Sequence, residues 1–206
     1  MQTIKTKFLF LVIFIALFSS CSEDDTVDEV SYKIGDAGPA GGLIVYVDDS
    51  KSTAFKYIEV APQDIDGSEW GCFNNPIVEA RESGIGMGME NSQAIVAFHD
   101  SLNDFYNNPS NCSDNSNGTV AAKACMDLVM GGFDDWFLPS EDEALLMYKN
   151  LHLQGLGNFN NELLYWTSTE HDDNTVVTTD FSNGDQGYLP KQIGGELTKI
   201  RADRYF

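Results

Sequence analysis

The sequence is poor in basic residues and in cysteine, and each shortage excludes a class of protein. Its 12 lysines and arginines face 32 aspartates and glutamates, which gives a formal net charge of −20 over 206 residues. A chain this acidic repels nucleic acid and anionic lipid at long range, so we expect no nucleic-acid partner. Its four cysteines contain no C-x-x-C pair, so we expect no zinc site of that pattern.

Sequence signatures of catalysis and of cofactor binding are also missing. There is no G-x-S-x-G elbow, no G-K-[ST] sequence and no EF-hand loop. The three histidines are not at ligand spacing from one another, and we expect each at the surface or at a helix edge. Gly84, Gly86 and Gly88 lack the rest of a nucleotide fingerprint and predict a tight loop before a helix. We therefore expect no catalytic residue and no cofactor, and the sequence leaves calcium open.

The longest apolar run, residues 8–18, has 11 positions, and a membrane-spanning helix needs roughly 20. It follows Lys5 and Lys7 and precedes Ser19 and Ser20, which is the pattern of a secretory signal peptide over residues 1–20.

Cys21 directly follows this segment, and residues 17–21 resemble a bacterial lipobox, with Phe18 where leucine is usual. We predict that Cys21 is lipidated and holds the protein on the outer membrane, with an acidic tether over residues 21–30. That tether resembles surface-export signals, so we also expect surface exposure. The alternative is an ordinary signal peptide cut near Ser20, with Cys21 as an incidental thiol.

The other three cysteines allow one disulfide and one free thiol. We expect Cys112–Cys125, which would close a polar loop that has little else to order it. Cys72 is the alternative partner.

The order of predicted elements is strands, then helices, then strands, which indicates an α+β fold. Strands are predicted over residues 43–47, 55–60, 164–169, 175–181 and 197–205. Helices are predicted over residues 92–106, from Thr119 to the Gly131–Gly132 pair, and from Ser140, where Ser140 and Glu143 form a capping box. We see no internal repeat and no second domain.

Several polar and aromatic residues are candidates for ligand contact. Trp166, Glu170 and Asp172 lie at or near the predicted loop 170–174, and the other candidate loop is 107–118. Asp134, Asp135 and Asp173 are weak candidates for a metal ligand, since acid clusters of this kind are more often turn residues. Trp136 is expected in the core. The one local group of positive charge, where a polyanionic glycan could dock, is Lys199, Arg201 and Arg204.

Four short motifs in order resemble the Lcl-type C-terminal domain family. They are Trp136-Phe137-Leu138-Pro139-Ser140 with Glu143, the segment 165–170 (Y-W-T-S-T-E), Phe181 with Gly184, and Ile200-Arg201-Ala202 with Arg204. The opening 34–42 also resembles relatives of the family. The resemblance covers about residues 33–206.

The resemblance implies a C-type-lectin-like domain over residues 31–206, a mixed fold with two to three helices and long loops whose terminal strands pair. It also implies a binding function. We therefore expect a cell-envelope lipoprotein that binds a glycan or a protein ligand, in adhesion or nutrient capture, without catalysis. The alternatives are a structural component that binds a partner protein in an envelope complex and, third, an enzyme that acts on glycans.

Overall fold

Two β-sheets organise the computed structural model, which describes residues 30–65 and 67–206. The predicted signal peptide, Cys21 and nearly all of the predicted tether lie outside the described residues. The unit that follows, Ser31–Phe206, is the one described below.

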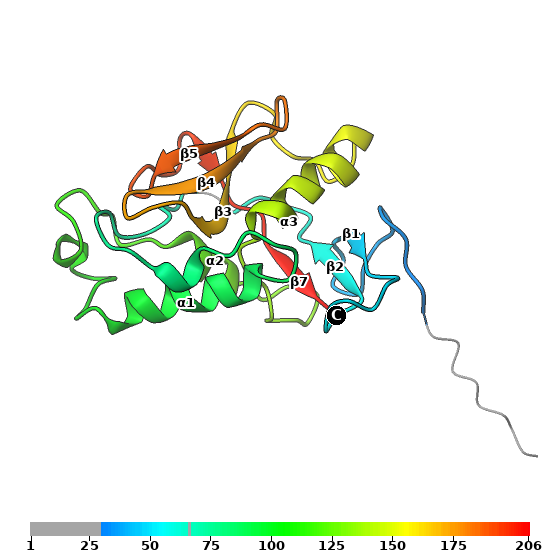
Figure 1. Ribbon diagram of the computed structural model, residues 1–206, viewed down its shortest axis with the longest axis horizontal. Helices are drawn as coiled ribbons and strands as arrows, with labels where there is room; N and C mark the ends of the chain where they lie inside the picture. The colour runs from blue at the N-terminus through cyan, green and yellow to red at the C-terminus, as the bar shows by residue number, and fades with distance from the viewer. Residues whose placement is uncertain (1–29, 66) are drawn as a thin grey trace, which may run out of the picture. The chain divides into compact units, whose positions relative to one another are not determined.

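The smaller sheet has three antiparallel strands in the order β1-β2-β7 (Figure 1). They are β1 (Leu43–Val47), β2 (Tyr57–Val60) and β7 (Asp203–Tyr205). The first and last strands thus share a sheet, but β7 pairs with β2 and not with β1. The N-terminal and C-terminal strands therefore lie together in one sheet.

The larger sheet has four strands in the order β5-β4-β3-β6, with β6 parallel to β3. They are β3 (Leu164–Glu170), β4 (Thr175–Asp180), β5 (Gln186–Pro190) and β6 (Thr198–Lys199). The single strand predicted over 197–205 is in fact two, β6 and β7, which belong to different sheets.

Three α-helices complete the predicted α+β class. They are α1 (Gly88–Ser101), α2 (Ala121–Met126) and α3 (Glu141–Leu146). In the described part of the chain, none is long and apolar enough to cross a bilayer. Short helical turns are η1 (Val78–Ala80), η2 (Pro109–Asn111), the π-helical η3 (Met147–Leu151) and η4 (His152–Gln154).

The predicted capping box starts α3. The Ser140 hydroxyl accepts from the Glu143 amide, and the Glu143 carboxylate accepts from the Ser140 amide at 2.8 Å. Both first-turn amides are satisfied by this reciprocal pair, so the helix has a defined first residue.

Helix α1 begins four residues before the predicted start. Asn91 and Ser92 therefore lie inside the helix, where their side chains donate to the Glu82 and Leu138 carbonyls. The glycine run forms the tight loop that we predicted, since Gly86 has a φ of +97°. A β-carbon on Gly88 would lie 2.3 Å from a Glu143 oxygen, so only glycine lets α1 begin against that carboxylate.

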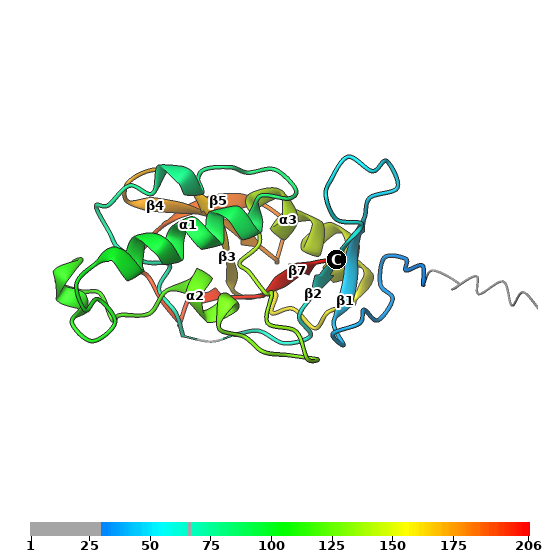
Figure 2. The ribbon, with the colours of Figure 1, turned by 90° about the horizontal axis from the view of Figure 1, so that it is seen from below.

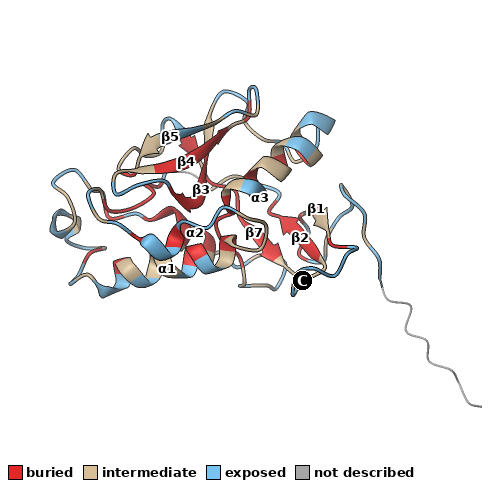
Figure 3. Ribbon diagram, in the orientation of Figure 1, coloured by how far each residue is buried: buried red, intermediate tan, exposed pale blue. Residues whose placement is uncertain are grey.

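The larger sheet is covered on both faces. Trp166 packs with Ile95 of α1 in one core cluster, while its neighbour Tyr165 packs with Ala144 and Met147 in the other. Alternation along β3 produces this division, because successive side chains point to opposite faces. α1 crosses the sheet on one side (Figures 1 and 2), and β3 is buried along nearly its whole length (Figure 3). Trp136 is 1% exposed, so its predicted core position is confirmed.

Glu59 of β2 joins the smaller sheet to the loop before it and forms a buried ion pair with Arg204 of β7. Glu59 accepts from the Ala40 and Gly42 amides at 3.0 and 2.8 Å, and from Arg204 at 3.1 Å. On its other side Arg204 pairs with the half-exposed carboxylate of Asp135.

Two of the three residues of the expected basic docking surface are therefore buried. Arg204 lies inside this network, and Arg201 is 1% exposed and pairs with Asp64. Arg201 also donates to the Ala61 and Gly157 carbonyls, so its guanidinium group interacts with partners inside the fold.

We predict that Glu59→Gln lowers the free energy of unfolding by about 3 kcal/mol, because it removes the buried partner of Arg204. Asp135→Asn is the matched control, since it removes the exposed partner of the same arginine and should cost less than about 1 kcal/mol. Urea unfolding followed by circular dichroism measures both. Equal losses in the two variants would contradict the assignment of Glu59 as the anchor.

Candidate functional site

The loop 170–174 joins β3 to β4 as a tight hairpin. The Asp172 carboxylate accepts from the Asn174 and Thr175 amides, both at 2.8 Å. These bonds favour the ionised form and lower the pKa of Asp172. Asp172 is exposed, so it is accessible to a ligand while it shapes the turn.

Two of the three predicted ligand residues are inaccessible. Trp166 is fully buried because β3 is a central strand with both faces covered, and its indole donates to the Ser68 carbonyl. Glu170 is 2% exposed. The prediction that Trp166 and Glu170 contact a ligand is wrong, whereas that for Asp172 stays a prediction.

Glu170 instead holds three segments together from the inside. It accepts from the Ile77 amide at 2.8 Å, from Arg81 at 2.7 Å, and from the ammonium of Lys191. Lys191 also donates to the Asn75 carbonyl at 2.7 Å. Burial lowers the pKa of Lys191, and its contact with Glu170 opposes that shift.

An aromatic platform lies beside this hairpin on the outside. The rings of His171 and Tyr188 stack with centroids 3.7 Å apart and planes 17° apart. Tyr188 lies on the edge strand β5 and is 59% exposed. Register places Tyr188 opposite Val177, on the face that also carries Gln186, whose amide donates to the Glu141 carbonyl of α3. We call His171 and Tyr188 the aromatic platform.

The weak metal candidates do not form a common site. Asp135 pairs with Arg204, and Asp173 pairs with Arg81 at 3.2 Å. Asp134 is exposed. Within residues 30–65 and 67–206, no three or more His, Cys, Asp or Glu side chains are gathered so that they could hold a metal ion.

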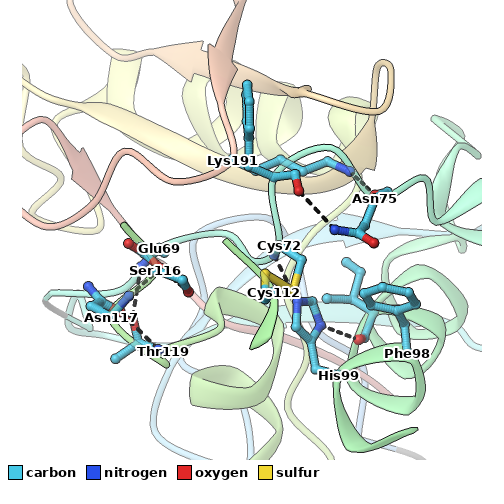
Figure 4. Close-up of a disulfide and its surroundings, with 12 residues drawn as sticks. Glu69, Cys72, Asn75, Phe98, His99, Cys112, Ser116, Asn117, Thr119 and Lys191 are labelled. Atoms are coloured by element: carbon cyan, nitrogen blue, oxygen red, sulfur yellow. Dashed lines mark hydrogen bonds between the residues drawn. A yellow bond between two sulfur atoms is a disulfide. The ribbon is translucent and has the colours of Figure 1, made fainter. Parts of the chain in front are cut away.

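The disulfide joins Cys72 to Cys112, with their Cα atoms 5.5 Å apart, and Cys125 is a buried free thiol (Figure 4). The prediction of Cys112–Cys125 is wrong, and the alternative partner, Cys72, is the right one. Cys125 lies on the face of α2 that packs into the core. The bridge ties the loop 107–118 to the segment before η1 across 40 residues.

In addition to the disulfide, the carboxylate of Glu69 orders the loop 107–118. Glu69 accepts from the Ser116 hydroxyl and from the Asn117 amide, each at 3.0 Å (Figure 4). The Glu69 amide in turn donates to the Thr119 hydroxyl. Hydrogen bonds to Glu69 therefore order this loop more than its polar sequence indicates.

His99, for which the sequence predicted a surface or helix-edge position, lies in the last turn of α1 beside the disulfide and is fully buried (Figure 4). Its Nδ1 lies 2.7 Å from the Ile95 carbonyl, and its Nε2 accepts from the Cys72 amide at 3.0 Å. These partners require a neutral ring with its proton on Nδ1. Burial lowers the pKa of His99 to about 4. Gly71 has no β-carbon to collide with this ring.

Comparisons with known proteins identify no family. No protein-family model matches the chain, and no curated protein matches it. Among solved structures, it is similar to a fimbrial protein from Bacteroides ovatus, at 11% sequence identity and a TM-score of 0.48. The match covers 82% of this chain and 45% of that protein, so the chain spans less than half of its neighbour's length.

We predict that non-reducing peptide mapping finds one cross-linked species, which contains Cys72 and Cys112. Cys72→Ser with Cys112→Ser should lower the free energy of unfolding by about 4 kcal/mol, from the chain entropy of a loop of this length. Cys125→Ser is the control and should keep the cross-link. A linked peptide that contains Cys125 would contradict the assignment.

We also predict a loss of stability in mild acid that depends on His99. The pKa of His99 is lower in the folded chain than in the unfolded chain. Its contribution to the free energy of unfolding is therefore complete above pH 6.5 and is lost as the pH falls toward 4. The loss should be about 2–3 kcal/mol. His99→Gln should remove this part of the slope when urea midpoints are compared between pH 7.5 and 4.5. An unchanged slope in the variant would contradict the prediction.

Proposed function

We propose that this protein is a cell-envelope lipoprotein whose domain binds a glycan, with the aromatic platform as the contact surface. The observation that carries the proposal is the exposed ring of Tyr188, on β5, stacked on His171 of the β3–β4 turn. Buried side chains hold this turn in place. Exposed aromatic rings offer a large, rigid, amphipathic contact at little entropic cost. Sugar rings have apolar faces suited to such a surface.

The support beneath the platform favours binding without rearrangement. Glu170 and Lys191 fix the end of β3 and the segment after β5, and Asp172 fixes the turn between β3 and β4. A surface held in this way has little freedom to lose when a ligand arrives. The exposed Asp172 carboxylate can accept hydrogen bonds from sugar hydroxyls.

The charge of the chain narrows the class of glycan. A net charge of −20 disfavours uronic-acid and sulfated polymers. Arg201 and Arg204, which could attract such polymers, are buried. The proposed ligand is therefore a neutral oligosaccharide. Lipidation at Cys21, surface display and the absence of catalysis belong to the same proposal and rest on the sequence patterns described above.

We predict that the full-length protein, purified in mild detergent, binds at least one neutral oligosaccharide on a glycan array. Tyr188→Ala should weaken that binding at least about tenfold, equivalent to about 1.4 kcal/mol. Tyr188→Phe keeps the ring and should bind within about threefold of the native protein.

Leu153→Ala is the surface control, because Leu153 is also exposed, at 58%, but lies on η4. It should bind as the native protein does. An array that is empty both with and without calcium would contradict the proposal, as would equal binding by Tyr188→Ala.

A further inference from the structure

A second surface, away from the aromatic platform, is an open groove of about 390 Å³. One wall is the segment 52–55 and the other is the segment 85–90 at the start of α1. Tyr205, on β7, also lines it. Nothing in the proposed glycan site uses this groove.

The lining is mainly apolar and aromatic. The rings of Phe55 and Tyr205 stack with centroids 4.0 Å apart and planes 5° apart. The opposite wall supplies Ile85, Met87 and Met89. Methionine side chains are flexible and polarisable, and they adapt to large apolar groups of different shapes.

Buried or nearly buried carboxylates hold both walls in place. Asp48 accepts from the Ser50 and Thr53 amides at 2.9 and 2.7 Å and so fixes the first loop. Glu143 accepts from the Gly86 amide at 2.8 Å and from the Tyr205 hydroxyl. The groove therefore exists before a ligand arrives, which lowers the entropic cost of binding.

The residues that line the groove carry one charge, although Lys51 and Lys56 flank the segment 52–55 in sequence. Glu90 is the one charged side chain among the lining residues, and it is exposed. Together with the net charge of −20, this favours an occupant with positive charge beside its apolar part.

We propose that this groove binds a basic segment of a partner protein, which inserts one large apolar side chain between Phe55 and Met89. An apolar side chain of a polypeptide fits better than a sugar, because Phe55, Met87 and Met89 present a mainly apolar surface and few hydrogen-bonding groups line the groove. The volume is near the lower end of the range for enclosed ligands, about 300–1,000 Å³. An open groove of this size suits a side chain that remains attached to its own backbone.

The test uses three acetylated, amidated peptides, Gly-Lys-Trp-Lys-Gly, Gly-Glu-Trp-Glu-Gly and Gly-Lys-Ala-Lys-Gly. Each peptide is titrated into the full chain, whose methionine methyl groups are labelled with ¹³C. Binding is followed by the NMR signals of these groups. We expect saturable shifts of the Met87 and Met89 methyl signals with Lys-Trp-Lys. Affinity for Glu-Trp-Glu should be at least about fivefold lower, and Lys-Ala-Lys should cause no saturable shift.

In Glu90→Gln, the affinities for the Lys-Trp-Lys and Glu-Trp-Glu peptides should differ by no more than about twofold. Glu82→Gln is the matched control, since Glu82 is exposed nearby in sequence but does not line the groove, and it should keep the preference. Absence of saturable shifts at both methionines would overturn the proposal. Equal affinities for the two tryptophan peptides, or a preference unchanged by Glu90→Gln, would also overturn it. These readouts are independent of Tyr188 and of the glycan array.

Discussion

The hydrogen bond from a main-chain amide to a buried carboxylate is the interaction on which this loop-rich fold depends. Glu59, Glu143 and Glu170 each accept from at least one amide of a distant loop. Glu69 does the same for the loop 107–118, and Asp48 for the loop that directly follows it. A bond to an ionised acceptor contributes about 1.5–3 kcal/mol, roughly twice a neutral one. Segments with no regular structure are thereby tied to the strands and helices around them.

This use of acids changes what the composition means. A net charge of −20 first indicates a repulsive surface, yet some of its acids lie inside and act as acceptors. Asp203 is also fully buried but differs from these acids, since neither of its carboxylate oxygens has a hydrogen-bond partner within the described residues. Burial raises its pKa well above the usual value for aspartate, as expected of an acid kept from water.

Local patterns predicted local structure well. The capping box at Ser140, the strand 43–47 and the core position of Trp136 follow from signals within a few residues. β5 was missed because Gln186–Pro190 contains glycine and proline and no β-branched residue, so its pairing with β4 defines it. Trp166 was misjudged because alternation along a strand does not reveal that both faces are covered. The partner of Cys112 depends on how the chain returns to Cys72, which no spacing rule encodes.

The amide anchors have a consequence for how sequences of this kind can diverge. Every residue except proline supplies the same main-chain donor, so the hydrogen bonds to Glu59, Glu143 and Glu170 do not themselves select a side chain. Packing and backbone geometry do so at the donor positions, because Ala40 and Ile77 are buried and Gly86 has a φ of +97°. Exposed loop residues between these donor positions can then be exchanged while the loop keeps its path, provided that the acid is retained. The platform and the groove both border such loops. The same scaffold can therefore present new recognition surfaces through substitutions that leave the framework of acids intact.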